Sequence, residues 1–222
     1  MKAYKLTDEN METMDGTKWG EGVTHKAIGE DKCLCSDGWI HFYTDLLIGI
    51  FMNPIHANFE NLIAWECETR SEELHAPLKS GCKQLTTVKQ VPLPRVTTTQ
   101  RVAFSILCAL EICKDANFVK WAHNWLSNID RTNESATTIY GAIYFIDAAA
   151  YATNAANYAT NYATNAATSA AANYAAANYA AATSANAVAN AAAYAATAAS
   201  AAAFNGKYID FSAIAKKALQ YT

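Results

Sequence analysis

The side chains that could carry chemistry lie in the first third of the chain. Cys33 and Cys35 are separated by one residue, and His41 follows closely, so thiolate and imidazole groups of the kind that bind zinc stand near one another. The common zinc pattern needs a second Cys-x2-Cys pair, which is missing here. We therefore interpret the two cysteines as buried free thiols and expect no metal and no cofactor. Glu66 and Glu68 lie on one face of an expected strand. The pair could act as a general acid and base, or it could be a solvated strand edge.

The sequence lacks the motifs that usually announce an enzyme. It has no glycine-rich phosphate loop, no nucleophile elbow and no metalloprotease helix motif. The 222 residues have a formal net charge of -3, so no basic field attracts nucleic acid. No run reaches the ~18 apolar residues of a membrane span, and the first residues lack the apolar stretch of a signal peptide. We expect a cytoplasmic protein with neither nucleic acid nor membrane as a partner.

Three other side chains form a loose constellation. His25 and Tyr43 lie on or beside expected strands, and Glu66 lies near a strand end. This pattern resembles ADP-ribosyltransferase-like folds, in which a His and an aromatic residue hold a nicotinamide dinucleotide and a Glu orients the ribose. The resemblance implies a nucleotide-processing enzyme with these three as weak catalytic candidates. The alternative is a polar strand edge with a hydrogen-bonded histidine.

The elements that must position these groups come from the pattern of the first ninety residues. Alternating and β-branched stretches predict strands, and Asp45–Met52 predicts a helix stopped by Asn53-Pro54. The predicted strands are Ala3–Leu6, Gly38–Tyr43, Leu62–Glu68 and Lys83–Val91. We expect an α+β fold whose residues 1–91 form a small domain with a mixed sheet.

Helical signals take over after a proline-containing linker at 92–94. Thr97 and Gln100 form a capping box, Asp115 can cap a second helix, and Asp210 to Leu219 predicts a last one. We expect residues 97–222 to form a second, all-α domain.

Most of this second domain is an alanine tract. Between residues 148 and 203, 32 of 56 residues are Ala and none is charged. Ala is the best helix former, and its methyl group lets helices approach closely, so we expect an antiparallel helical bundle or array. The uncharged outer face makes a homo-oligomer a possible assembly. A pentapeptide β-solenoid is the competing interpretation of the five-residue spacing near Tyr174 and Tyr179.

Two stripes along the tract are candidate binding surfaces. The tyrosines at positions 140, 144, 151, 158 and 162 lie on one face of a helix. Thr153 and Thr164, which are 11 residues apart, lie on another face of that helix. The candidate binding residues are Tyr151, Tyr158, Tyr162, Thr153 and Thr164.

Several short motifs resemble one uncharacterised family of phage and prophage proteins, whose members often have a small-residue repeat tail. The motifs are Met1–Lys5, Cys35–Phe42, Trp65-Glu66, Thr98–Phe104, Trp121-Ala122, Trp125–Ser127 and Asp130–Thr132. The resemblance implies a phage setting, a small N-terminal α+β domain and an alanine-rich helical repeat region, but no chemistry. This chain has Asn and Thr where those relatives have charged residues in the alanine helices.

Three hypotheses for function follow. The first is a non-enzymatic, phage-encoded interaction protein, used in counter-defence, that binds or sequesters a host protein or small molecule. The second is the ADP-ribosyltransferase-like enzyme. The third is surface templating such as ice binding, because alanine-rich antifreeze helices repeat Thr every 11 residues, as Thr153 and Thr164 do once.

Overall fold

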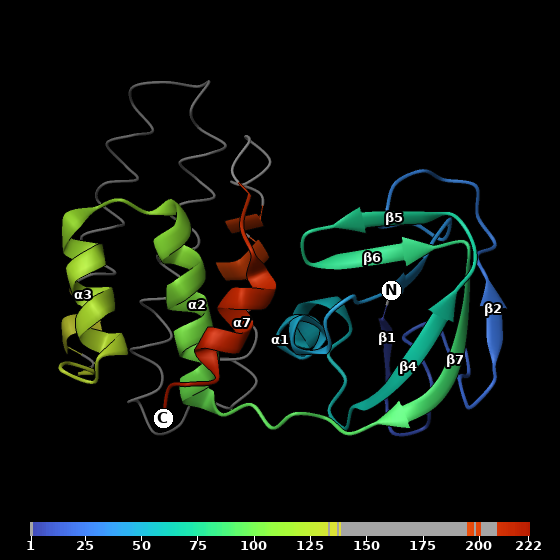
Figure 1. The fold of residues 1–222 in the computed structure, drawn as a ribbon, viewed down its shortest axis with the longest axis horizontal. Helices are drawn as coiled ribbons and strands as arrows, with labels where there is room; N and C mark the ends of the chain where they lie inside the picture. The colour runs from blue at the N-terminus through green and yellow to red at the C-terminus, as the bar shows by residue number, and fades with distance from the viewer. Residues whose placement is uncertain (1, 133, 137, 139–194, 198, 201–207) are drawn as a thin grey trace. The chain divides into compact units, whose positions relative to one another are not determined.

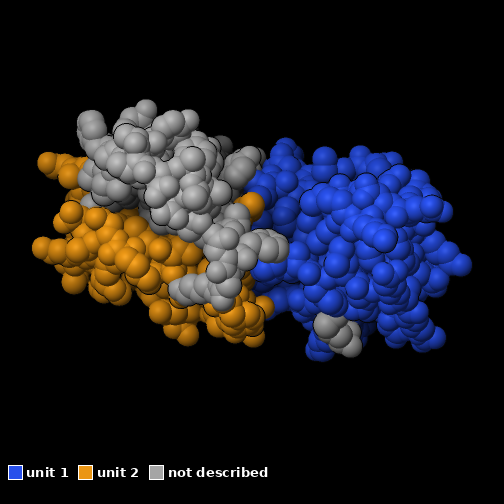
Figure 2. Space-filling model, turned by 90° about the horizontal axis from the view of Figure 1, so that it is seen from above, with its two compact units in different colours: residues 1–95 blue, residues 96–222 orange. Residues whose placement is uncertain are grey.

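A computed structural model describes residues 2–132, 134–136, 138, 195–197, 199–200 and 208–222. The chain divides into two compact units, Met1–Arg95 and Val96–Thr222, which Figure 2 colours separately. Each unit is described by itself.

The first unit consists of two antiparallel sheets and one helix (Figure 1). The four-stranded sheet has the order β1-β4-β7-β2, and the three-stranded sheet has the order β3-β6-β5. The strands are β1 (Ala3–Thr7), β2 (Thr24–Lys26), β3 (Ile40–Phe42), β4 (Ile63–Thr69), β5 (Glu73–Ala76), β6 (Lys79–Cys82) and β7 (Gln84–Val91).

The expectation of one small mixed sheet is wrong, because every strand pair in the first unit is antiparallel and the strands form two sheets. The connections explain the difference. Residues 70–72 join β4 to β5, Pro77-Leu78 joins β5 to β6, and Lys83 alone separates β6 from β7. The two-residue link between β5 and β6 returns the chain antiparallel, whereas a parallel neighbour needs a crossover of a dozen or more residues. The short links after β4 and after β6 lead from one sheet into the other.

The two sheets are joined at two places. Tyr4 and Tyr43 exchange backbone hydrogen bonds of 2.8 Å, which connects β1 to the end of β3. Lys83 turns the chain from β6 into β7, and its backbone groups bond to Glu72 and Ala27. The sheets therefore enclose a common interior.

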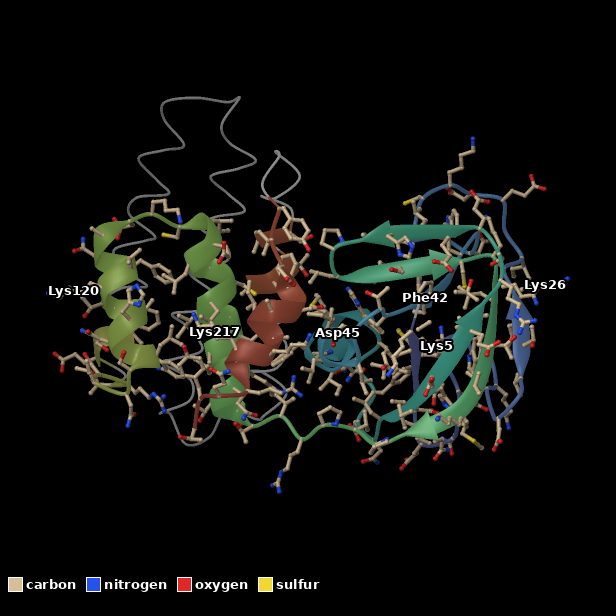
Figure 3. The ribbon with its side chains drawn as sticks, viewed as in Figure 1. Lys5, Lys26, Phe42, Asp45, Lys120 and Lys217 are labelled. Carbon is tan, nitrogen blue, oxygen red and sulfur yellow. The ribbon has the colours of Figure 1, made fainter. Side chains whose placement is uncertain are left out.

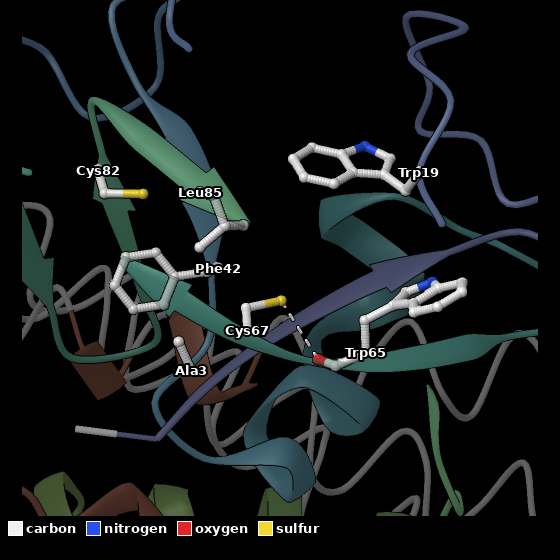
Figure 4. Packing of buried hydrophobic residues seen from close by; sticks show 7 residues of the cluster. All are labelled: Ala3, Trp19, Phe42, Trp65, Cys67, Cys82 and Leu85. Carbon is white, nitrogen blue, oxygen red and sulfur yellow. Dashed lines mark hydrogen bonds between the residues drawn. The ribbon is translucent and has the colours of Figure 1, made fainter. Parts of the chain in front are cut away.

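A cluster of large apolar side chains fills part of that interior (Figure 4). Trp65, on β4, is 3% exposed, and its indole nitrogen donates to Thr7 Oγ1 at 3.2 Å. The other members are Ala3, Trp19, Phe42, Cys67, Cys82 and Leu85. Strand alternation places Ala3, Lys5 and Thr7 on one face of β1, so Lys5 shares the inward face with two fully buried residues.

Helix α1 (Leu46–His56) lies against β1 and continues past its predicted end at Asn53-Pro54. Asp45 caps its start by accepting from the Leu47 amide at 2.8 Å. Pro54 removes one amide donor, but the last turn closes because the amides of Ala57 and Asn58 donate to the Asn53 carbonyl. The buried Asn53 side chain also binds both backbone groups of Phe59, at 3.0 and 3.2 Å.

The described part of the second unit contains α2 (Thr98–Ile112), α3 (Ala116–Leu126) and α7 (Phe211–Ala218). The predicted caps are confirmed: Thr97 and Gln100 form a capping box, and Asp115 accepts from an amide at the start of α3. Asp210 also caps its helix, by accepting from the Ala213 amide at the start of α7. Helix α2 contacts both of the others. Gln100 Nε2 also donates to the Leu219 carbonyl at 2.9 Å, which ties α7 to the start of α2.

The fold class predicted for the second domain is corrected as well. The described helices are α2, α3, α7 and short helical fragments, and they do not make an all-α, alanine-rich array. Most of the alanine tract, at 139–194, 198 and 201–207, lies outside the described residues. The fold observed is an antiparallel two-sheet β domain with helices.

Candidate functional site

The first unit contains a cavity of about 410 Å³ between its two sheets and the end of α1. This volume lies in the range of small-molecule sites. Its walls come from separate parts of the chain: Lys5 on β1, His25 on β2, His41 on β3 and His56 at the end of α1. The sheets thus bring together groups that are up to fifty residues apart in sequence.

Aromatic rings form much of the wall. Trp19 is 5% exposed, and the His25 ring meets it edge-on at a centroid distance of 4.7 Å. Tyr43 and His56 stack at 5.9 Å, and Tyr43 Oη is hydrogen-bonded to His56 Nδ1 at 2.9 Å. Trp39, 7% exposed, completes this set. Such walls suit a flat, apolar part of a ligand.

Lys5 places a cation on the inward face of β1. In Figure 3 the Lys5 side chain lies inside the sheet domain, whereas the Lys26 side chain points outward from β2. Its Nζ donates to the His41 carbonyl at 3.0 Å and lies 5.0 Å from the centre of the Trp19 ring. Burial lowers the pKa of Lys5 to about 8, although Cys67 and Asp15 nearby act in the opposite direction. The amine is charged at neutral pH at an energetic cost.

The pKa values of the two histidines His41 and His56 are lowered by nearby positive charge as well as by burial. Burial, and to a smaller extent the charges of Lys79 and His41, lowers the pKa of His56 to about 4. The pKa of His41 also falls, first through burial and then through Lys79 and Lys5, against the effect of its bond to the Leu34 carbonyl. Burial raises the pKa of Tyr43, so its hydroxyl stays protonated. At neutral pH the imidazoles of His41 and His56 are therefore neutral.

The carboxylates of the cavity lie at its rim. Asp15 and Asp37 are both exposed, whereas Lys5, Lys79 and His41 are half-buried. Burial would raise the pKa of Asp15, but hydrogen bonds from Thr13 and Thr17 lower it to about 2. Both threonine hydroxyls donate to this carboxylate at 2.7 Å. The negative charge of Asp15 is thus already held by its own loop.

The structure brings together two of the three predicted catalytic candidates. His25 and Tyr43 line the same cavity, but Glu66 is not among its lining residues. Glu66 follows Trp65 on β4 and points to the opposite face, where it pairs with Lys89 at 3.5 Å. The carboxylate that an ADP-ribosyltransferase-like site requires does not meet the other two groups.

The cysteines near this site are free but not buried. Cys33 and Cys35 are exposed, because they lie in the open loop before β3, so the expectation of burial is wrong for both. His41 binds the Leu34 carbonyl through Nε2. Across the described residues no three His, Cys, Asp or Glu side chains gather as a cation site. In the same residues no helix has the length and apolarity to cross a bilayer.

Sequence reasoning missed Lys5, His56, Lys79 and the tryptophan walls. One signal was present: Lys5 interrupts the buried face of a predicted strand, where an apolar residue is usual. The candidate binding residues Tyr151, Tyr158, Tyr162, Thr153 and Thr164 all lie outside the described residues.

Comparisons of the chain with protein families, with curated proteins and with solved structures found no match. The site is therefore interpreted from its own geometry.

Proposed function

We propose that this is a non-enzymatic binding protein whose first unit captures a small molecule in the cavity between the two sheets. One observation carries the proposal: a cavity of about 410 Å³ has walls of aromatic rings and nitrogen-bearing side chains from β1, β2, β3, β6 and α1. Concave sites of this size with apolar walls and a few convergent polar groups are the usual form of ligand sites.

The protonation states of Tyr43 and His56 favour binding over proton transfer by these two groups. Tyr43 keeps its proton, and the low pKa of His56, about 4, keeps its imidazole neutral at physiological pH. The two are hydrogen-bonded to each other at 2.9 Å, so each already has a partner. Groups with such distant pKa values are poor proton carriers near neutral pH, but they make a rigid polar wall.

The biological setting belongs to the proposal as well. The resemblance of several short motifs to phage and prophage proteins is the reason for proposing a phage-encoded protein that acts in the host cytoplasm. Removing a small host molecule from solution would fit a role in counter-defence, and it requires binding without turnover.

The test is capture of a small molecule by the purified full chain. The protein is incubated with a small-molecule extract of bacterial cells, desalted and denatured, and the released compounds are measured by mass spectrometry. Ala27, which lines the cavity, is replaced by Trp to fill it, and Ala76 on β5, which does not line it, is replaced by Trp as the matched control.

We expect the wild type and Ala76→Trp to release the same enriched compound and Ala27→Trp to release none. Unfolding midpoints of the two variants verify that both are folded. Equal enrichment by all three proteins, or by none, would refute the proposal.

A further inference from the structure

The cavity has an uneven distribution of charge. Its half-buried charged groups are the cations Lys5 and Lys79, whereas the carboxylates of Asp15 and Asp37 are exposed at the rim. The whole chain is acidic, with a formal net charge of -3. A positive interior in an acidic protein is a local feature and not a result of overall composition.

We propose that the ligand is a small organic anion with a flat apolar part, that its carboxylate, sulfonate or phosphate group binds Lys5 inside the cavity, and that Lys79, which also lines the cavity, adds positive charge. This inference rests on the proposed function and names the class of ligand.

The bonding of Lys5 leaves capacity for such a group. An ammonium has three donors, and the Lys5 ammonium has one hydrogen-bond acceptor among the described residues, the His41 carbonyl at 3.0 Å. The ion pairs found in the described part of the chain include neither Lys5 nor Lys79. Lys79 Nζ instead contacts Cys35 Sγ at 3.1 Å, a weak acceptor. An anion bound at Lys5 would supply the strong acceptor that this ammonium lacks, and Lys79 lines the same cavity.

A carboxylate of the protein does not take this place. Asp15 reaches Lys5 through its electric field, but both of its oxygens accept from Thr13 and Thr17. Burying a charge without a partner is costly, so a half-buried lysine that lacks a carboxylate partner favours a ligand that brings one.

The walls define the rest of the ligand. Trp19, Trp39 and Tyr43 are each at most 9% exposed and line the cavity with ring surface. At the mouth, Met14 is 76% and Ile28 is 90% exposed, and both are among the lining residues. Apolar side chains exposed at the mouth of a cavity are typical of a ligand-binding surface. Together they fit an anionic group inside and an aromatic or aliphatic body extending toward the mouth.

Two fluorescent probes with the same ring system test the class of ligand. The first is 1-anilinonaphthalene-8-sulfonate, and the second is N-phenyl-1-naphthylamine, which lacks the sulfonate. Each is titrated into the wild type, Lys5→Met, Lys79→Met and the control Lys32→Met, whose lysine is exposed and does not line the cavity. Ala27→Trp reports binding outside the cavity.

We expect the wild type to bind the sulfonate at least tenfold more tightly than the neutral probe. Lys5→Met should lose about tenfold in affinity for the sulfonate, the scale of one charge-assisted hydrogen bond, with no change for the neutral probe. Lys79→Met should act in the same direction, and Lys32→Met should have little effect.

The outcomes separate the two proposals. If both probes bind with equal affinity and Ala27→Trp abolishes the binding of both, the inference of an anionic ligand is overturned, but the proposed binding cavity stands. Sulfonate binding that survives both Lys5→Met and Ala27→Trp would place the probe elsewhere and overturn the inference. Binding of neither probe would overturn the inference, and failure to capture any compound from the extract would overturn the proposed function.

Discussion

Replacing Lys5 by Met should make the protein more stable. Lys5 is held in a half-buried position where its pKa is about 8 instead of 10.5. A shift of this size corresponds to about 3 kcal/mol of unfavourable free energy for the charged form in the folded state. Methionine has a similar length and no charge, so it avoids this cost.

Part of the gain is lost with the contacts that Lys5 makes. The bond from Lys5 Nζ to the His41 carbonyl, at 3.0 Å, contributes about 1 kcal/mol, and the contact with the Trp19 ring contributes about 0.5 kcal/mol. We therefore expect Lys5→Met to raise the free energy of unfolding by about 1.5 kcal/mol at pH 7. Lys26→Met, at an exposed position, should stay within about 0.5 kcal/mol of the wild type.

The pH dependence has a definite sign. Because the folded pKa of Lys5 is below its unfolded value, the unfolded chain binds the extra proton between about pH 8 and 10.5. The stability of the wild type should gain from this group as pH rises through that window, so the advantage of Lys5→Met should shrink and disappear. Urea unfolding at pH 7, 9 and 10.5 measures it. A destabilised Lys5→Met, or an advantage independent of pH, would refute this account of Lys5.

Other expected outcomes follow from buried groups of the first unit. Asn53→Ala should lower the free energy of unfolding, measured in urea, by about 2 kcal/mol, because the two backbone groups of Phe59 lose their partner. The exposed control Asn61→Ala should lower it by less than about 0.5 kcal/mol. Equal effects of the two substitutions would contradict the role of Asn53. The pKa of His56 falls from 6.5 to about 4 on folding, so its contribution to stability is complete above pH 6.5 and is lost as pH falls toward 4. Urea midpoints at pH 7 and 4.5 should differ less in His56→Gln than in the wild type, and an unchanged difference would count against this assignment. With a thiol reagent at pH 8, Cys33 and Cys35 should react in the folded protein and the four buried cysteines only after unfolding; fast reaction of more than two thiols would show that the interior is open.

Local signals in the sequence predicted local structure well. The capping box of Thr97 and Gln100 marks the start of α2 because a side chain and an amide three residues apart satisfy each other. Asp45, Asp115 and Asp210 mark helix starts for the same short-range reason.

The arrangement of the strands could not be predicted in the same way. The hairpin of β5 and β6 contains Glu, Lys, Ser and Gly, which have low strand propensity, and pairing within the sheet holds it in place. Pro54 is a usual stop signal, yet α1 ends two residues later because Asn53 satisfies the chain beyond it.

The cavity depends on contacts between distant residues. Lys5 and His41 are 36 residues apart, and they meet only because the Tyr4–Tyr43 pair joins the two sheets. The spacing of residues along the chain does not predict that Lys5 and His41 lie next to each other. His25 and Tyr43, grouped with Glu66 by residue type, line one cavity, but the sequence could not tell which face of β4 Glu66 would take.

The central claim is that a small anion binds inside the first unit, and the tryptophan indole N–H signals of the folded protein test it directly. The chain has five tryptophans, which give five resonances to be assigned in a ¹⁵N-labelled sample. Titration with 1-anilinonaphthalene-8-sulfonate should shift the signals of Trp19 and Trp39, which line the cavity, and leave those of Trp121 and Trp125 in place. Shifts confined to Trp121 and Trp125, or no shift at any tryptophan, would contradict the account.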